Sequence, residues 1–289
     1  MIRELRTLGR HALIYGSGFL LARAAGFLLV PLYTRFLTPA DYGVIELLDL
    51  TGFFLATFAA LGMRGRAVIL MYHRVLEDDG IPPDLHPGMF VTRRTFEKHL
   101  RLLRTSHTLV TIDQIGEWLK GQATFERPPC ALTFDDGWLD NYETAFPLLK
   151  AYGATATIFL ITGNRGTTGM MSWEQVLEME RAGIAFGSHT VSHVELGKCE
   201  PERIREELVE SRKTLEERLA RMSEWFCFPK GSYNRQAVEL VGEHYAGAVT
   251  VDSGWVSPGD DPRRLRRIGV HDDMSWTTPL FAWRLASLR

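Results

Sequence analysis

CALTFDDG, residues 130–137, is an apolar, β-rich run that delivers two adjacent carboxylates to a glycine. Such a run predicts a buried strand that ends at the acids. Successive strand residues point to opposite faces, so Asp135 and Asp136 must serve different purposes unless the backbone bends between them.

A pair of histidines follows about fifty residues later, in SHTVSH (188–193). His189 and His193 are four residues apart, a spacing that lets two imidazoles converge on one metal ion. One carboxylate and two histidines leave a divalent ion with open positions, which a hydrolytic centre needs, and the second carboxylate is free to act as a base. Alone, DDG is commonly a turn and H-x3-H a surface or core pair. Their order within one strand–helix series favours a metal site.

Strands and helices alternate from Ala67 onward. The predicted strands cover residues 67–73, 130–136, 154–161, 184–189, 225–229, 246–252 and 265–270. The predicted helices cover residues 92–105, 112–120, 142–152, 172–183, 202–221 and 234–244, and the charged run 202–218 reads as a solvated helix face. This alternation predicts a parallel sheet with crossover helices, in which ligands bind at the carboxyl ends of strands. Six polar or proline residues lie at such ends, which indicates one shared site: His73, Asp135, Asp136, His189, Pro229 and Asp252.

Composition narrows the class of protein. The chain has 289 residues, of which 45% are hydrophobic and 24% charged, with a formal net charge of -2. This length suits one large domain or two smaller ones, and the near-neutral charge gives no electrostatic case for nucleic acid as a partner. The three cysteines form no CxxC pair, so neither a zinc knuckle nor a disulfide framework is indicated.

Residues 1–66 differ from the rest of the chain and predict a hydrophobic helical hairpin. Residues 12–33 are long enough to span a bilayer, and residues 44–63 form a second apolar stretch. We therefore predict a membrane anchor within residues 12–63, the alternative being two amphipathic helices packed on the domain at 67–289. Arginines flank both ends of the hairpin, so the positive-inside rule places the main domain on the cytoplasmic side.

The hairpin also resembles a known family. Residues 1–63, and above all VPLYTRFLTPADYG (30–43), look like the opening two helices of polysaccharide flippases of the O-antigen type. Those transporters need many more helices, so the resemblance implies an anchor, a scaffold associated with polysaccharide export, or the remnant of a gene rearrangement.

The main domain resembles the polysaccharide deacetylase family, the NodB-homology group of the carbohydrate esterase family 4 type. The similarity runs from about residue 67 to 280 and is carried by five motifs in order: MYHRV (71–75), TFDDG (133–137), GSHTVSH (187–193), FPKGSYN (228–234) and VDSGWVSPGDD (251–261). It implies an α/β fold with a distorted (β/α)7-type barrel. The implied reaction is the removal of N-acetyl groups from an amino-sugar polysaccharide or its lipid-linked precursor, by metal-activated water.

The resemblance also implies roles for particular residues. Asp136, His189 and His193 would hold a divalent metal, most often zinc, with cobalt and nickel as alternatives, and Asp135 would be the general base. The Lys230 N–H, next to Pro229, would bind the oxyanion. Trp138 would stack on a sugar ring or pack in the core. His73 is preferred over His271 as the group that protonates the leaving amine.

One motif departs from the family pattern. The third motif usually reads R-P-P-Y-G, with an arginine that orients the base, whereas this chain has Cys227 at that position. Arg266 or Arg267 would then supply the positive charge. The departure leaves a second hypothesis open, a catalytically inactive carbohydrate-binding module.

Overall fold

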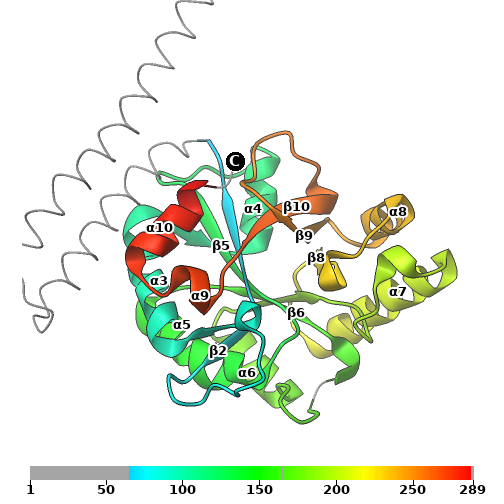
Figure 1. The fold of residues 1–289 in the computed structure, drawn as a ribbon. Coiled ribbons are helices and arrows are strands. Elements are labelled where there is room, and N and C mark those ends of the chain that lie inside the picture. The colour runs from blue at the N-terminus through cyan, green and yellow to red at the C-terminus, as the bar shows by residue number, and fades with distance from the viewer. Residues whose placement is uncertain (1–64, 165, 288–289) are drawn as a thin grey trace, which may run out of the picture. The chain divides into compact units, whose positions relative to one another are not determined.

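The structure is a computed structural model that describes residues 65–164 and 166–287 (Figure 1). The predicted hairpin, its resemblance to flippases and the domain boundary at residue 66 lie outside the described residues or at their edge, so they stay predictions. Within the described ranges, no helix combines the length and apolar character that crossing a bilayer requires.

Seven parallel strands form a closed barrel, which confirms the predicted (β/α)7-type fold. In order around the ring, they are β1 (Val68–Tyr72), β5 (Pro129–Phe134), β6 (Thr157–Leu160), β7 (Ala185–Ser188), β8 (Trp225–Cys227), β9 (Gly247–Ser253) and β10 (Leu265–Gly269). The ring closes because β1 pairs with both β5 and β10. An additional strand, β4 (Thr108–Val110), pairs with the first half of β5 and distorts the barrel.

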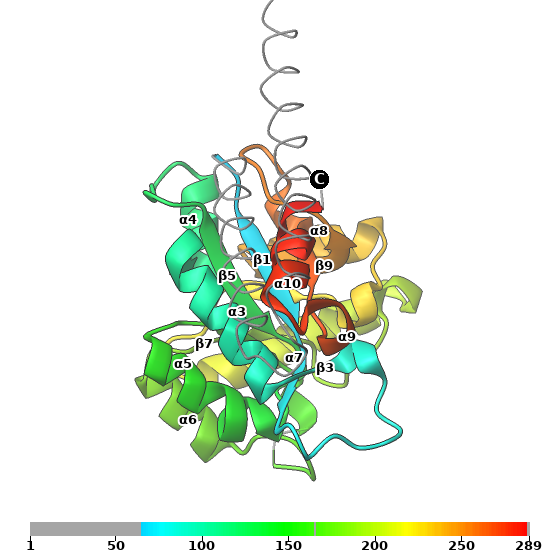
Figure 2. The same ribbon diagram turned by 60° about the vertical axis from the view of Figure 1, so that its left-hand side comes forward.

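Helices surround the strands (Figures 1 and 2). They are α3 (Arg93–Ser106), α4 (Ile112–Leu119), α5 (Phe146–Tyr152), α6 (Trp173–Arg181), α7 (Pro201–Arg218), α8 (Arg235–His244), α9 (Asp272–Ser275) and α10 (Thr278–Ser287). Local sequence sets where several of them begin. Thr111 with Gln114 and Ser172 with Gln175 form reciprocal capping boxes, which satisfy the first free N–H groups of α4 and α6.

Some elements were not predicted from the sequence. Three of them are short strands: β4, and the strands β2 (Arg74–Leu76) and β3 (Phe90–Thr92), which form a small sheet of their own. Each has three residues, too few to show the two-residue alternation of a strand. The short α9 and α10 were also missed. The helix predicted for residues 142–152 is in fact a π-helical turn, Asn141–Ala145, followed by α5.

The two faces of each strand have different surroundings. On β1, Val68, Leu70 and Tyr72 belong to the cluster packed under the helices, whereas Ile69 belongs to the cluster inside the barrel. On β5 the inward positions are the odd ones, which begin with Ala131. The pleat therefore continues through Thr133 to Asp135 and carries a carboxylate toward the barrel axis.

Gly187 on β7 provides a test of this packing. A Cβ atom there would lie 2.7 Å from the Trp225 carbonyl oxygen and 2.8 Å from the Phe159 ring. Because backbone on β8 cannot give way, we expect Gly187→Ala to lower the free energy of unfolding by about 1–3 kcal/mol in urea titrations. Gly80→Ala is the control, since its nearest neighbour would be 3.7 Å away. Equal stability of both variants would contradict this packing.

Candidate active site

The backbone bends where β5 ends, and this bend places both acids at one site. Asp135 still donates its backbone N–H to the Tyr72 carbonyl at 3.0 Å, so it continues the sheet. Asp136 adopts a left-handed conformation with φ of 72°, and Gly137 follows with φ of 79°. The alternation of a flat strand is therefore broken, and the two carboxylates serve different neighbours within one site.

Asp136, His189 and His193 come together as the sequence predicts. The Nε2 atoms of both histidines lie 3.4 Å from Asp136 Oδ1, and all three candidate ligand atoms lie within 4.8 Å of one another. Two donors that are each about 2.1 Å from a tetrahedral metal lie about 3.4 Å apart. These side chains therefore fit a divalent ion of that size, with a position open to a further ligand.

Contacts behind two of these side chains, His189 and Asp136, fix their orientation. His189 Nδ1 donates to the Cys227 carbonyl at 2.7 Å, so Nε2 is the nitrogen that faces Asp136 and would bind an ion. The Trp138 indole N–H donates to Asp136 Oδ2 at 2.9 Å and leaves Oδ1 to the histidines. Burial lowers the pKa of His189, but Cys227 and Asp136 outweigh it and hold that pKa well above its usual value. The site therefore stabilises added positive charge.

Asp135 has a different partner, Arg267. The guanidinium binds it with two hydrogen bonds of 2.7 Å, NH1 to Oδ1 and NH2 to Oδ2, and both side chains are buried. Burial alone would raise the pKa of Asp135, but the charge and hydrogen bonds of Arg267 hold it well below the usual range for a carboxyl group. Asp135 is thus ionised and fixed in direction.

Arg266, the alternative partner considered from the sequence, contacts a different acid. Its guanidinium pairs with Asp260 at 3.3 Å near the surface, whereas the fully buried Arg267 reaches Asp135. Neighbouring strand residues point to opposite faces, so only one of the two arginines can enter the barrel.

The two candidate proton donors have different surroundings. His73 follows β1, and its Nε2 lies 4.0 Å from Asp135 Oδ2. Burial lowers the pKa of His73, and the carboxylates of Asp135 and Asp136 only partly oppose this. His271 follows β10 and instead contacts Asp273, with 3.0 Å between Nδ1 and Oδ1.

The remaining predicted residues lie on neighbouring segments. Pro229 and Lys230 form a short 3-10 turn after β8, with Lys230 in a left-handed conformation (φ 54°) and its amine 3.4 Å from Glu195. One face of the Trp138 ring is covered by Arg74, 4.7 Å from the centroid. Its contacts are therefore to Asp136 and Arg74, and a role in sugar stacking stays a prediction.

Sequence reasoning missed one residue near this site, Glu207. The run 202–218 was predicted to be a solvated face, and for Glu207 this is wrong, because only 1% of its side chain is exposed. Its spacing from the apolar residues Ile204 and Leu208 places it on the buried side of α7, a signal that the periodicity contained.

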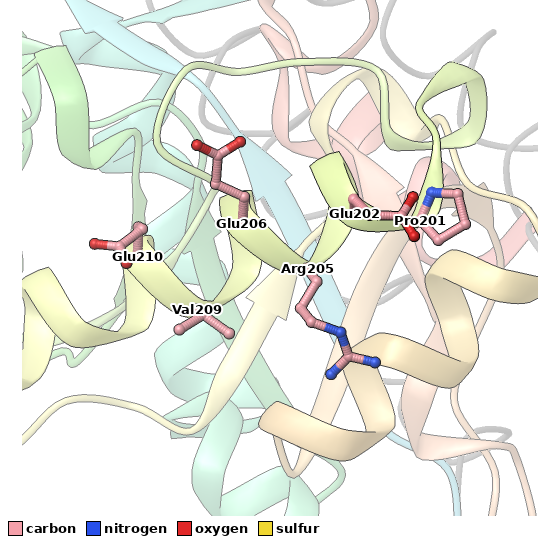
Figure 3. A pocket seen from close by; sticks show the side chains of 6 residues that line it. All are labelled: Pro201, Glu202, Arg205, Glu206, Val209 and Glu210. Carbon is pink, nitrogen blue, oxygen red and sulfur yellow. The ribbon is translucent and has the colours of Figure 1, made fainter.

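A hollow on the outer side of α7 contains none of the predicted site residues (Figure 3). Its lining residues all belong to the first ten residues of that helix: Pro201, Glu202, Arg205, Glu206, Val209 and Glu210. The candidate site is defined by side-chain geometry at the strand ends and not by this hollow.

A parallel barrel with paired acids and histidines at its carboxyl ends defines a class of hydrolytic enzyme, and comparisons specify which one. The family profile for polysaccharide deacetylases matches residues 122–247. YxkH of Bacillus subtilis (strain 168), a proposed polysaccharide deacetylase, is 31% identical over 211 residues, 72% of each chain. This protein therefore belongs to the polysaccharide deacetylase family and is an enzyme of that class.

Two further relatives support this membership. The poly-beta-1,6-N-acetyl-D-glucosamine N-deacetylase of Staphylococcus aureus (strain MSSA476) is 24% identical over 232 residues, which is 72% of this chain and 79% of the relative. The Streptococcus pyogenes deacetylase PplD, solved in complex with acetate, superposes with a TM-score of 0.68 and 27% identity. That match covers 73% of this chain and 94% of PplD.

The Arg267 contact generates a stability and pH prediction. Arg267→Met leaves Asp135 buried without its cation, so we expect a loss of about 3–5 kcal/mol in unfolding free energy. The pKa of Asp135 should rise, because burial is no longer opposed. Activity that needs the carboxylate will then fall off at a higher pH in the variant than in the wild type.

Urea unfolding and the acid limb of the kcat/KM profile measure both effects. Arg266→Met is the matched control, and we expect its stability to stay within about 0.5 kcal/mol of wild type. An acid limb at the same pH in wild type and Arg267→Met would show that Arg267 does not govern Asp135.

Proposed function

We propose that this enzyme removes N-acetyl groups from an amino-sugar polysaccharide or its lipid-linked precursor, with a divalent metal held by Asp136, His189 and His193. The observation that carries the proposal is the pair of 3.4 Å separations between Asp136 Oδ1 and the two imidazole nitrogens, beside a separately held Asp135. The name of the Staphylococcus aureus relative supports an N-acetylglucosamine polymer as substrate class.

Zinc is the metal that we propose first, with cobalt and nickel as alternatives, because two imidazoles and one carboxylate suit all three. When bound, such an ion supplies a nucleophilic water at neutral pH and polarises the acetamide carbonyl. Trp138 leaves one oxygen of Asp136 to the ion, and the Cys227 carbonyl fixes the tautomer of His189. These two contacts orient Asp136 and His189 independently of the metal.

Asp135 is proposed as the general base that takes the proton of the attacking water. Arg267 fixes the direction of both its oxygens and lowers its pKa, so a proton accepted there is released again readily. His73 Nε2 lies 4.0 Å from Oδ2 and is placed to receive that proton. Burial lowers the pKa of His73 as well, so a proton held on its ring passes easily to the leaving amine nitrogen.

The carbonyl oxygen gains negative charge as water adds, and we propose the Lys230 N–H as its hydrogen-bond donor. Pro229 begins the turn that carries this group, and the left-handed conformation of Lys230 sets its direction. A fixed donor at this position stabilises the charge without reorganisation.

The contact between Arg267 and Asp135 bears on the alternative of an inactive carbohydrate-binding module. That hypothesis rests on the missing motif arginine, and in this chain a guanidinium on β10 pairs with the proposed base instead. It therefore supports the enzyme over the inactive module.

The membrane part of the proposal rests on the sequence alone. Residues 12–63 would tether the enzyme to a bilayer, with the catalytic domain on the cytoplasmic side, near lipid-linked or nascent polymer. The alternative role for these residues is a scaffold for polysaccharide export.

Two substitutions separate metal binding from base catalysis. Asp135→Asn should keep one equivalent of metal and lose about 10²–10⁴-fold in turnover, because the amide cannot accept the proton. His189→Ala should lose both metal and turnover, and His244→Ala, a histidine on α8, should lose neither. Metal analysis and amine release from N-acetylglucosamine oligomers are the measurements. Full turnover by Asp135→Asn would disprove the assignment of the base.

Leaving groups of different basicity test the proton donor. An amide nitrogen must be protonated to depart, whereas an activated phenol departs unaided. We therefore expect His73→Ala to lose about 10²-fold or more on an N-acetyl amino sugar and to keep most of its rate on 4-nitrophenyl acetate. His271→Ala is the matched comparison. If the selective loss appears in His271→Ala instead, the proton comes from His271.

A further inference from the structure

Helix α7 carries a buried carboxylate that the proposed mechanism does not use. Glu207 is 1% exposed, while Glu206 beside it is 60% exposed. Burying a carboxylate is costly unless hydrogen bonds replace its water. Its partners therefore show what the residue does.

Apart from Arg203, the hydrogen-bond partners of Glu207 belong to the segment between the two candidate metal histidines. Oε2 accepts the backbone N–H of Val191 at 2.7 Å and that of Ser192 at 3.0 Å. Oε1 accepts the Ser192 hydroxyl and the Arg203 guanidinium. One carboxylate thus accepts four donors and fixes both peptide N–H groups between Thr190 and His193.

This segment needs such support because its own backbone is strained. Thr190 and His193 flank the two residues that Glu207 binds, and their φ values are 67° and 59°. This left-handed region costs residues other than glycine about 1–3 kcal/mol each. His193 is also the less enclosed of the two histidines, with 27% of its side chain exposed against 2% for His189. Contacts from outside the segment therefore have to hold it in this conformation.

A second residue of α7 contacts the end of β7, the strand that leads into the segment. Ser211, one turn after Glu207, lies 2.7 Å from the Ser188 hydroxyl, which in turn accepts the Thr190 N–H at 3.3 Å. The buried side of α7 therefore contacts both the end of β7 and the two middle residues of the segment, Val191 and Ser192.

We propose that Glu207 is a positioning residue that holds the 190–193 segment, and with it His193, in the geometry required for metal binding. The inference rests on the proposed metal site and extends it to a residue that touches neither metal nor substrate. Both carboxylate oxygens matter, because Gln offers one acceptor oxygen and an amide group that would face donors.

Glu207→Gln and Glu206→Gln form a matched pair. Both remove one charge from the same helix and both alter a contact of Arg203, but only Glu207 contacts the segment. We expect zinc affinity, measured by competition with a chromophoric chelator, to fall about 10–100-fold in Glu207→Gln and to change less than about twofold in Glu206→Gln. The visible spectrum of the cobalt form should change in Glu207→Gln alone.

A readout without metal tests the geometry directly. Amide hydrogen exchange at Val191 and Ser192 in the metal-free protein should speed up in Glu207→Gln and stay unchanged in Glu206→Gln. A residue that merely stabilised the fold would lower the melting temperature without changing the zinc affinity of the folded protein. Wild-type exchange rates and wild-type affinity in Glu207→Gln would overturn the inference.

Failure of this inference can be distinguished from failure of the proposed function. The metal site itself is wrong if the wild-type protein binds no zinc, or if His189→Ala does not abolish the zinc binding. That result would not depend on the behaviour of the Glu207 variants. If Glu207→Gln does not fold, Ser192→Ala removes one of the four contacts at an exposed residue. We expect the same loss of zinc affinity there, smaller in size, and unchanged affinity in that variant would also overturn the inference.

Discussion

The buried ion pair of Asp135 and Arg267 is the interaction on which the architecture of this site depends. A charge inside a barrel costs several kcal/mol unless every polar atom finds a partner. Arg267 meets this condition, since its five N–H groups reach Asp135 twice, Thr133, Cys227 and the Thr250 carbonyl. These partners lie at or beside β5, β8 and β9, and Arg267 itself is on β10. One guanidinium therefore ties four strands together and at the same time fixes the direction of the proposed base.

Backbone strain at the described strand ends is concentrated where the chemistry is proposed. Among the residues that the structure describes, four non-glycine residues have positive φ: Asp136, Thr190, His193 and Lys230. Each belongs to, or adjoins, a predicted ligand or oxyanion donor. Such conformations persist only where surrounding contacts impose them, and here those contacts come from Trp138 and Glu207. The site is thus formed by bends that the strands alone would not adopt.

Much of this arrangement could be predicted from the sequence, for physical reasons. The alternation of apolar strands and amphipathic helices predicts a parallel barrel, and parallel strands bring their carboxyl ends to one face. The order of the motifs therefore places Asp136, His189 and His193 at one end of the barrel, but their convergence also depends on the bends after β5 and β7. The sequence showed that the two acids could share one site only if the backbone bends between them. It did not predict that bend, because the residue pattern of a strand does not reveal a single left-handed residue. Glu207 was missed because its charge was given more weight than its place on the apolar side of α7. Nor could the sequence choose between Arg266 and Arg267, since that choice depends on which of two alternating positions on β10 points inward.

The absence of the motif arginine has a spatial explanation. The family motif places that arginine on the segment where this chain has Cys227, and Cys227 Sγ lies 3.2 Å from the Arg267 guanidinium. A small side chain on β8 therefore leaves room for an arginine that enters from β10. Two arginines at these positions would place like charges side by side in a buried site. An arginine on β10 therefore favours a small, neutral residue on β8. In this chain the positive charge beside Asp135 therefore comes from β10, and β8 contributes a small neutral side chain next to it.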